Sequence, residues 1–174
     1  QLAFDFEDEI FTDSYFATHI TPDTAGYSAK LVYSGNKSVM HYVASNGTTL
    51  DLPVDLAANE TYTVSFKYLN IKEDATINAA IGLNGTAAET IKLTADSEWQ
   101  TCSAEVTTST DSDEATITIS GDSVNIYIDD ICVIPNDDQL TLSVAVGDAE
   151  NGTGTADYSR IVPEMPVKFT ATAN

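Results

Sequence analysis

Apolar and polar residues alternate with a period of two along most of this chain. The stretch 61–69 shows the pattern most clearly, with aromatic and aliphatic side chains on one face and polar side chains on the other. The apolar face is Tyr62, Val64, Phe66 and Tyr68, and the polar face is Thr61, Thr63, Ser65 and Lys67. Such a strand packs one face on a core and turns the other to water or ligand.

Ten segments carry this strand pattern, and turn sequences such as Asn84-Gly85 separate them. They are 2–6, 28–34, 38–44, 48–52, 61–69, 76–82, 89–93, 98–107, 114–120 and 124–134. No stretch of a dozen residues has the apolar spacing of an amphipathic helix. Ten short strands are more than the seven of an immunoglobulin sandwich. This number favours an all-β, two-sheet antiparallel jelly-roll β-sandwich. Its predicted buried set is Tyr62, Val64, Phe66, Ile117, Ile119, Ile126 and Ile128.

The pattern predicts two regions, a jelly roll over 1–136 and a linker with a partial β-domain over 137–174. In the second region, the strand-like stretches 140–146 and 167–173 flank the Gly-rich stretch 147–155. Two or three strands cannot bury a core alone. This short C-terminal β segment therefore either packs on the first region or begins another domain.

Charge narrows the range of partners. The chain has 27 acidic and 7 basic residues, a formal net charge of −20. A nucleic-acid backbone and an anionic membrane are both repelled by such a surface, which leaves neutral ligands, cations or basic proteins. No apolar run approaches the roughly 18 residues of a membrane span. We interpret the start at Gln1 as a processed or cut boundary, and we expect a secreted or cell-surface protein.

Few residues suggest catalysis. Cys102 and Cys132 lack the close spacing of a zinc or redox pair. They are either small core residues on inward faces, alongside Ala104 and Ile134, or a disulfide. His19 and His41 form no HExxH motif, and no GxSxG motif occurs. Among 27 acids, two carboxylates at a glycosidase's spacing arise by chance. We therefore predict a protein that is not an enzyme.

Five short motifs occur in an order typical of one family. They are FDFED (4–8), AGYSAKLVY (25–33), LAANETYTVSFKY (56–68), SEWQTCSAEVTT (97–108) and VNIYIDDICVI (124–134). This succession, from Phe4 to Pro135, resembles the carbohydrate-binding modules of the family four/nine type, within the galactose-binding-like jelly rolls. The end of the chain, VKFTATAN, is similar to the opening of an internalin-type bacterial repeat.

The resemblance implies a structural calcium where the first strand, the segment around 25–33 and the last strand converge. Its expected ligands are the side chains of Glu7 and Asp129, the Gly26 carbonyl, and also the Lys30 carbonyl and Asp130. Carboxylate and carbonyl oxygens are the ligands that calcium prefers. The alternative is that Asp129 and Asp130 are merely solvated at a strand end.

The resemblance also implies that the module binds a polysaccharide or glycan. Sugar sites combine an aromatic plate with polar groups that hydrogen-bond hydroxyls. The candidate plates are Tyr15, Phe16, Tyr33, Tyr42 and Trp99, and the candidate polar partners are Asn70, Asn78, Glu98 and Gln100. We thus expect a non-catalytic carbohydrate-binding module, monomeric in isolation. The alternative is a structural spacer or adhesin module without sugar binding.

Overall fold

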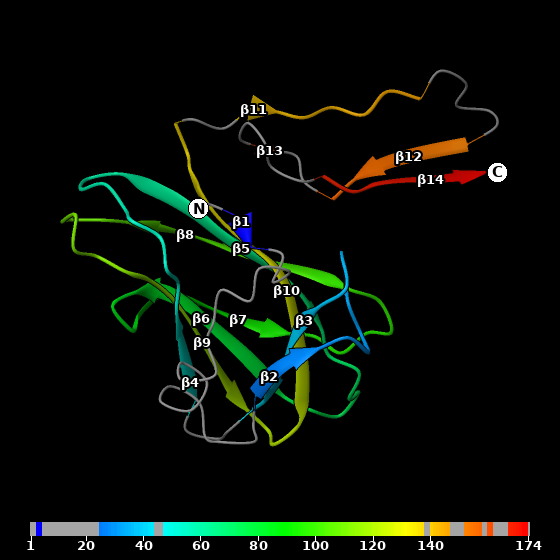
Figure 1. Cartoon of the computed structure of the whole chain (residues 1–174), viewed down its shortest axis with the longest axis horizontal. Coiled ribbons are helices and arrows are strands. Elements are labelled where there is room, and N and C mark those ends of the chain that lie inside the picture. Colours follow the sequence, from blue (N-terminus) through cyan, green and yellow to red (C-terminus); the bar gives the residue numbers. More distant parts are fainter. Residues whose placement is uncertain are drawn as a thin grey trace. The chain divides into compact units, whose positions relative to one another are not determined.

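The computed structural model describes residues 3–4, 25–43, 47–137, 140–146, 152–157, 160–161 and 167–173. Within these ranges all regular structure is β, so the described part contains no helix able to cross a membrane. The chain divides into two compact units, Gln1–Val133 and Ile134–Asn174. Unit 1 is built from two antiparallel sheets (Figure 1), which confirms the predicted jelly-roll sandwich.

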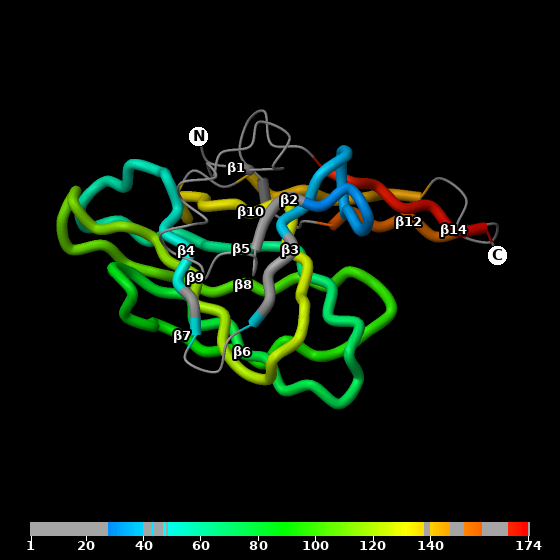
Figure 2. The backbone as a smooth tube through the Cα atoms, turned by 60° about the horizontal axis from the view of Figure 1, so that its bottom comes forward, coloured from blue at the N-terminus to red at the C-terminus, as the bar shows by residue number. Residues whose placement is uncertain are grey.

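Among the described residues, the first sheet has six strands in the order β2-β3-β10-β5-β8, and β1 also pairs with β10. Its strands are β1 (Ala3–Phe4), β2 (Ala25–Ser28), β3 (Ser38–Tyr42), β5 (Thr61–Leu69), β8 (Gln100–Thr107) and β10 (Asn125–Pro135). β10 has two successive partners along one side. It pairs with β3 over Asn125–Ile128 and with β1 at Ile131–Cys132. Figure 2 lets the reader follow β10 beside β3 and β5.

The second sheet has four strands in the order β4-β9-β6-β7. They are β4 (Thr48–Asp51), β6 (Ile77–Leu83), β7 (Thr86–Leu93) and β9 (Ala115–Gly121). The β6–β7 hairpin turns at Asn84 and Gly85, whose φ angles are 53° and 75°. Two consecutive positive φ values define the type I′ turn that Asn-Gly favours. The turn predicted here is therefore confirmed.

The core lies between the two sheets. All seven residues predicted to be buried are at most 3 % exposed. Phe66, Ile117, Ile126 and Ile128 are completely buried within it. The period-two pattern thus located the core correctly.

One predicted strand is displaced. The expected strand 28–34 is replaced by β2, which ends at Ser28, and by a bent segment over 29–37 that we call the Tyr33 loop. Side-chain oxygens of Asp129 and Asp130 accept hydrogen bonds from this loop. The amides of Tyr33 and Ser34 are therefore paired where the chain has left the sheet.

A second correction concerns the cysteines. Neither forms a disulfide and both are buried, and Cys102 lies in the core cluster with Ala104, as predicted. Cys132 and Ile134 are also buried, but they stand outside that cluster. Ile131 and Val133 take the core positions on β10 instead. Since neighbouring residues of a strand face opposite sides, Cys132 points away from the face that carries Cys102.

The described part of unit 2 contains two two-stranded pieces, β11 with β13 and β12 with β14. The strands are β11 (Leu140–Thr141), β12 (Gly152–Ala156), β13 (Arg160–Ile161) and β14 (Phe169–Ala173). The predicted strand 140–146 ends at Thr141, and part of the Gly-rich stretch forms β12. Phe169 is 63 % exposed. The described part of unit 2 thus leaves large apolar side chains at its surface.

Candidate functional site

The site begins at a change of register in β10. Ile126 and Ile128 belong to the core, and so do Ile131 and Val133. Two residues, Asp129 and Asp130, separate the two sets, where strict alternation would allow one. Asp130 takes a φ of 44°, a conformation that Asp adopts more readily than most residues. An extra residue of this kind is typical of a β-bulge, which redirects side chains.

The redirected carboxylates hold the Tyr33 loop, the blue stretch between β2 and β3 in Figure 2. Asp129 Oδ2 accepts the backbone N–H of Tyr33 at 2.8 Å and that of Ser34 at 3.2 Å. Asp129 Oδ1 accepts the N–H of Asp130 at 2.9 Å. The Ser34 hydroxyl donates to Asp130 Oδ1 at 2.6 Å. The bonds from Tyr33 and Ser34 therefore fix this part of the loop against β10.

The environment of Asp129 is unusual for a carboxylate, because its exposed fraction is 0 %. Burial raises the pKa of Asp129 to about 7, and the adjacent Asp130 charge also raises it. The backbone N–H groups of Tyr33, Ser34 and Asp130 act in the opposite direction, since they stabilise the charged form. The carboxylate is therefore held in place mainly by backbone amides.

The loop places Tyr33 against Trp99. Their ring centroids are 5.9 Å apart at an interplanar angle of 61°, an edge-to-face contact, and both side chains are partly exposed. Lys67 Nζ lies 5.0 Å from the centre of the Tyr33 ring. The same ammonium donates to Thr101 Oγ1 at 2.7 Å. The structure thus brings together two of the five predicted aromatic plates, with one lysine against the Tyr33 ring.

Lys67 itself corrects a prediction. Ser65 and Lys67 were expected on a face open to water or ligand, but they are 5 % and 3 % exposed. Thr61 and Thr63, on the same face, remain partly exposed. The Tyr33 ring over the Lys67 ammonium and the Thr101 hydroxyl beside it explain why Lys67 is covered.

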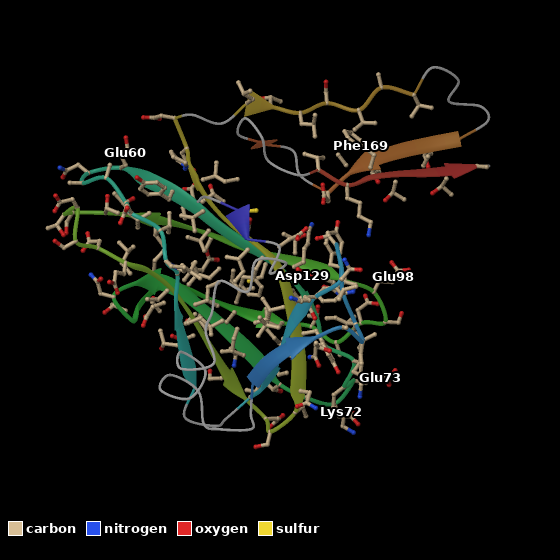
Figure 3. The ribbon with its side chains drawn as sticks, viewed as in Figure 1. Glu60, Lys72, Glu73, Glu98, Asp129 and Phe169 are labelled. Atoms are coloured by element: carbon tan, nitrogen blue, oxygen red, sulfur yellow. The ribbon has the colours of Figure 1, made fainter. Side chains whose placement is uncertain are left out.

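A second hydrogen-bonded turn holds Trp99. Asp96 Oδ1 accepts the Glu98 N–H at 3.2 Å, and Asp96 Oδ2 accepts a hydrogen bond from Gln100 Nε2 at 2.9 Å. Gln100 Oε1 in turn accepts the Tyr68 hydroxyl at 3.0 Å. Trp99 therefore stands between two anchored residues. Figure 3 labels Glu98, which is exposed beside it, and Asp129 on β10.

The other candidates are distributed differently. Tyr42 ends β3 opposite Asn125, and its side chain, like Tyr15 and Phe16, lies outside the described residues. Asn78 is on β6, in the other sheet. Asn70 is 1 % exposed, and its amide is bonded to the Leu93 carbonyl and the Lys72 N–H. Of the polar candidates, Glu98 and Gln100 adjoin the aromatic pair.

The expected calcium ligands can be compared with the same geometry. Asp129 and Asp130 are adjacent, and an ionised carboxylate has about four lone-pair sites, of which Asp129 uses three. Hard oxygens beside a buried negative charge fit calcium chemically. Gly26 pairs with Met40 on β3, and Met40 pairs with Tyr127 on β10. One strand, β3, therefore lies between Gly26 and β10. The Lys30 N–H donates to Ser28 Oγ, and Lys30 is exposed.

A third carboxylate for such an ion is not found among the residues that the structure describes. No group of three His, Cys, Asp or Glu side chains comes together there. Glu7, the expected partner of Asp129, lies outside the described residues. The calcium site therefore remains a prediction.

The fold of unit 1 is that of carbohydrate-binding-module jelly rolls. The chain resembles the family 35 module-bearing β-(1,4)-mannanase of Podospora anserina (TM-score 0.54, 20 % identity), covering 78 % of this chain and 27 % of that one. It also resembles a family 35 carbohydrate-binding module from an environmental isolate (TM-score 0.52, 19 % identity), covering 65 % and 84 %.

A third similar structure is a family 6 module from Cellvibrio mixtus lichenase 5A in complex with cellotriose. Its TM-score is 0.50 at 15 % identity, covering 77 % of this chain and 98 % of that one. No protein-family model and no curated protein sequence matches the chain. At these identities the likeness establishes the fold, whereas membership of the family four/nine type and the internalin-like tail stay predictions.

Proposed function

We propose that this chain is a non-catalytic carbohydrate-binding module of a secreted or cell-surface bacterial protein. Tyr33 and Trp99 form its platform for a sugar ring. One observation carries the proposal: two partly exposed aromatic rings meet at 5.9 Å, each held by its own hydrogen-bonded loop. An apolar ring face suits the C–H face of a pyranose, and nearby Glu98 supplies a hydrogen-bond acceptor.

The known modules of similar fold support this function and suggest the first ligands to test. One is bound to cellotriose, and another belongs to a β-(1,4)-mannanase. A platform for neutral sugars also agrees with the net charge of −20, which disfavours polyanionic partners. Attachment of such a module raises the local concentration of a linked catalytic domain at its polymer.

The test is native affinity electrophoresis in gels containing mannan, β-glucan or xylan, with pull-down on insoluble cellulose. We expect at least one polysaccharide to retard the wild-type chain. Trp99→Ala and Tyr33→Ala should abolish the retardation. Phe169→Ala, which removes an exposed aromatic ring from unit 2, should leave it unchanged. The aromatic platform is wrong if Trp99→Ala binds as tightly as the wild type.

A wild-type chain that binds no glycan on these gels or on a glycan array would overturn sugar binding itself. The alternative function, a structural spacer or adhesin module, would then replace it. Thermal unfolding of each variant serves as the control for correct folding, because loss of binding is meaningful only for a folded protein.

The proposal includes a structural calcium held by Glu7 and Asp129, with the Gly26 carbonyl and, further, the Lys30 carbonyl and Asp130. Two features support it: the ligand atoms are hard oxygens, and Asp130 adds a second charge beside the buried Asp129. A bound divalent cation would offset the repulsion between these neighbouring carboxylates and tie the first strand to the last one.

A further inference from the structure

We infer that Asp129 and Asp130 are positioning residues that set Tyr33 against Trp99 before a ligand arrives. They act through the Tyr33 loop by direct hydrogen bonds. The inference rests on the proposed function, because it takes Tyr33 and Trp99 as the sugar platform. It goes further by assigning the geometry of that platform to two carboxylates 96 residues away in sequence.

The location of the two carboxylates supports this role. β10 pairs with β3 as far as Ile128 and with β1 from Ile131, so Asp129 and Asp130 lie between its two partners. The positive φ of Asp130 turns the chain at this point. The Tyr33 loop approaches there and contributes the N–H groups of Tyr33 and Ser34. The bulge in β10 and the departure of the loop from the sheet are therefore two parts of one arrangement.

The chemistry of the contact requires an acceptor-only group. Within the described part of the chain, Asp129 accepts three hydrogen bonds from backbone N–H donors, two on Oδ2 and one on Oδ1. An ionised carboxylate meets them without offering a competing donor. An asparagine has one acceptor oxygen and one NH₂ donor, so at least one of these N–H groups would face another donor. Asp129→Asn therefore keeps the size of the side chain while disrupting the contact.

The Trp99 side of the platform has supports of its own. The Trp99 turn is held by Asp96 and Gln100, and Lys67 is bonded to Thr101. Releasing the Tyr33 loop should consequently move Tyr33 while Trp99 keeps its own anchors. The two rings would separate, and a ligand would then have to order the loop on binding.

Trp99 provides a direct readout, because it is the only tryptophan in the chain. The contact with Tyr33 covers part of its ring, so loss of the contact should increase collisional quenching of Trp99 fluorescence by acrylamide. The measurement uses the full chain in EDTA and without glycan. It therefore tests the hydrogen-bonded contact separately from calcium and from sugar binding.

Three variants define the experiment. Asp129→Asn disrupts the amide contacts, and Ser34→Ala removes the 2.6 Å bond to Asp130 while the Ser34 N–H stays in place. Asp113→Asn is the matched control, because Asp113 likewise accepts the N–H groups of Ser109 and Thr110. The backbone N–H of Thr110 contributes most to keeping the pKa of Asp113 well below its usual range.

The control lies far from Trp99. Asp113 follows the end of β8 and Trp99 precedes its start, so the eight residues of β8 separate them by about 25 Å. Glu60, whose N–H donates to Thr108 just beyond β8, and Glu98 lie at opposite ends of unit 1 in Figure 3. Asp113→Asn should therefore disturb its own loop and leave Trp99 quenching at the wild-type level.

We expect Asp129→Asn to increase the Trp99 quenching constant clearly, Ser34→Ala to increase it less, and Asp113→Asn to leave it unchanged. With a glycan identified, Asp129→Asn should weaken binding about threefold to tenfold, the effect of ordering one side chain on binding.

Two results would overturn the inference. One is wild-type quenching of Trp99 in a folded Asp129→Asn chain, or in Ser34→Ala if Asp129→Asn does not fold. The other is a wild-type chain whose Trp99 becomes as accessible in EDTA as that of Asp129→Asn, since a metal and not the direct bonds would then hold the loop. Neither result depends on whether a sugar binds.

Discussion

Replacing Phe66 by alanine should cost unit 1 a large part of its stability. Phe66 lies in β5, between β10 and β8 in the first sheet, and its exposed fraction is 0 %. Its ring centroid is 6.3 Å from that of Tyr68. Alanine at this position removes the ring from the middle of the core and leaves a cavity that neighbouring strands cannot fill without moving. Phe169→Ala is the control, because the same change is made at a side chain that is 63 % exposed.

The expected magnitude follows from burial. Phe→Ala in a packed core costs about 3–5 kcal/mol, the sum of lost transfer energy and cavity formation. A domain is stable by about 5–15 kcal/mol, so this change removes about a fifth of the total or more. Surface substitutions stay within about 0.5 kcal/mol, which is the expectation for Phe169→Ala. The two variants should therefore differ by at least about 2.5 kcal/mol.

Urea unfolding followed by Trp99 fluorescence measures the difference, because this single tryptophan belongs to unit 1. With a slope of about 2 kcal/mol per molar urea, Phe66→Ala should lower the midpoint by roughly 1.5–2.5 M. The midpoint of Phe169→Ala should match the wild type. A Phe66→Ala midpoint within about 0.5 M of wild type would mean that β5 is not in the core, and the two-sheet arrangement would have to be abandoned.

Three further expectations follow from individual residues. The melting temperature should be higher in calcium than in EDTA, by the equivalent of about 2.7 kcal/mol at a hundredfold excess of calcium over Kd, and Glu7→Gln should abolish the difference. Equal melting curves for the metal-free and the calcium-loaded wild type would exclude the ion. Burial raises the pKa of Cys102 to about 12, so its thiol is protonated at pH 8 and a thiol reagent should not label it in the folded chain. The unfolded, unreduced chain should show two thiols, and finding none would indicate a disulfide. Gly121→Ala should lower the urea midpoint more than Gly85→Ala, because both glycines have positive φ but only at Gly121 would a Cβ collide with the Thr76 carbonyl oxygen. Equal effects would contradict the close approach of Gly121 to Thr76 at the end of β9.

The strands and the core could be predicted because burial on one face produces a local pattern. Tyr62, Val64 and Phe66 alternate with polar residues, and all three are buried. The same rule failed for Ser65 and Lys67. Tyr33, a residue distant in sequence, lies over Lys67, and nothing within 61–69 records that contact. Alternation reports which face meets the main core, but it does not report what covers the other face.

The bulge in β10 could not be located from the sequence, because residues 131–134 are all apolar and fit either register. The apolar core positions Ile126, Ile128, Ile131 and Val133 are spaced by two, three and two residues. The single spacing of three marks an inserted residue at Asp129-Asp130 and reverses the faces of all that follow. The structure, with Ile131 and Val133 in the core, places the Cys132 thiol away from Cys102 and excludes the pairing that the sequence left open.

The aromatic platform was only half predictable, and the reason is physical. Residue type identified Tyr33 and Trp99 as candidates among five aromatic residues, because a sugar site needs a flat apolar surface. Their meeting depends on the hydrogen bonds that Asp129 accepts from the Tyr33 loop and that Asp96 accepts around Trp99, and side-chain bonds to loops leave no periodic signal. The sequence did mark Asp129 and Asp130, but as calcium ligands. Direct bonding to loop amides and coordination of an ion use the same property of a buried carboxylate, its need for positive partners. The residues of a site can therefore be inferred from residue types, whereas the hydrogen bonds that bring them together cannot.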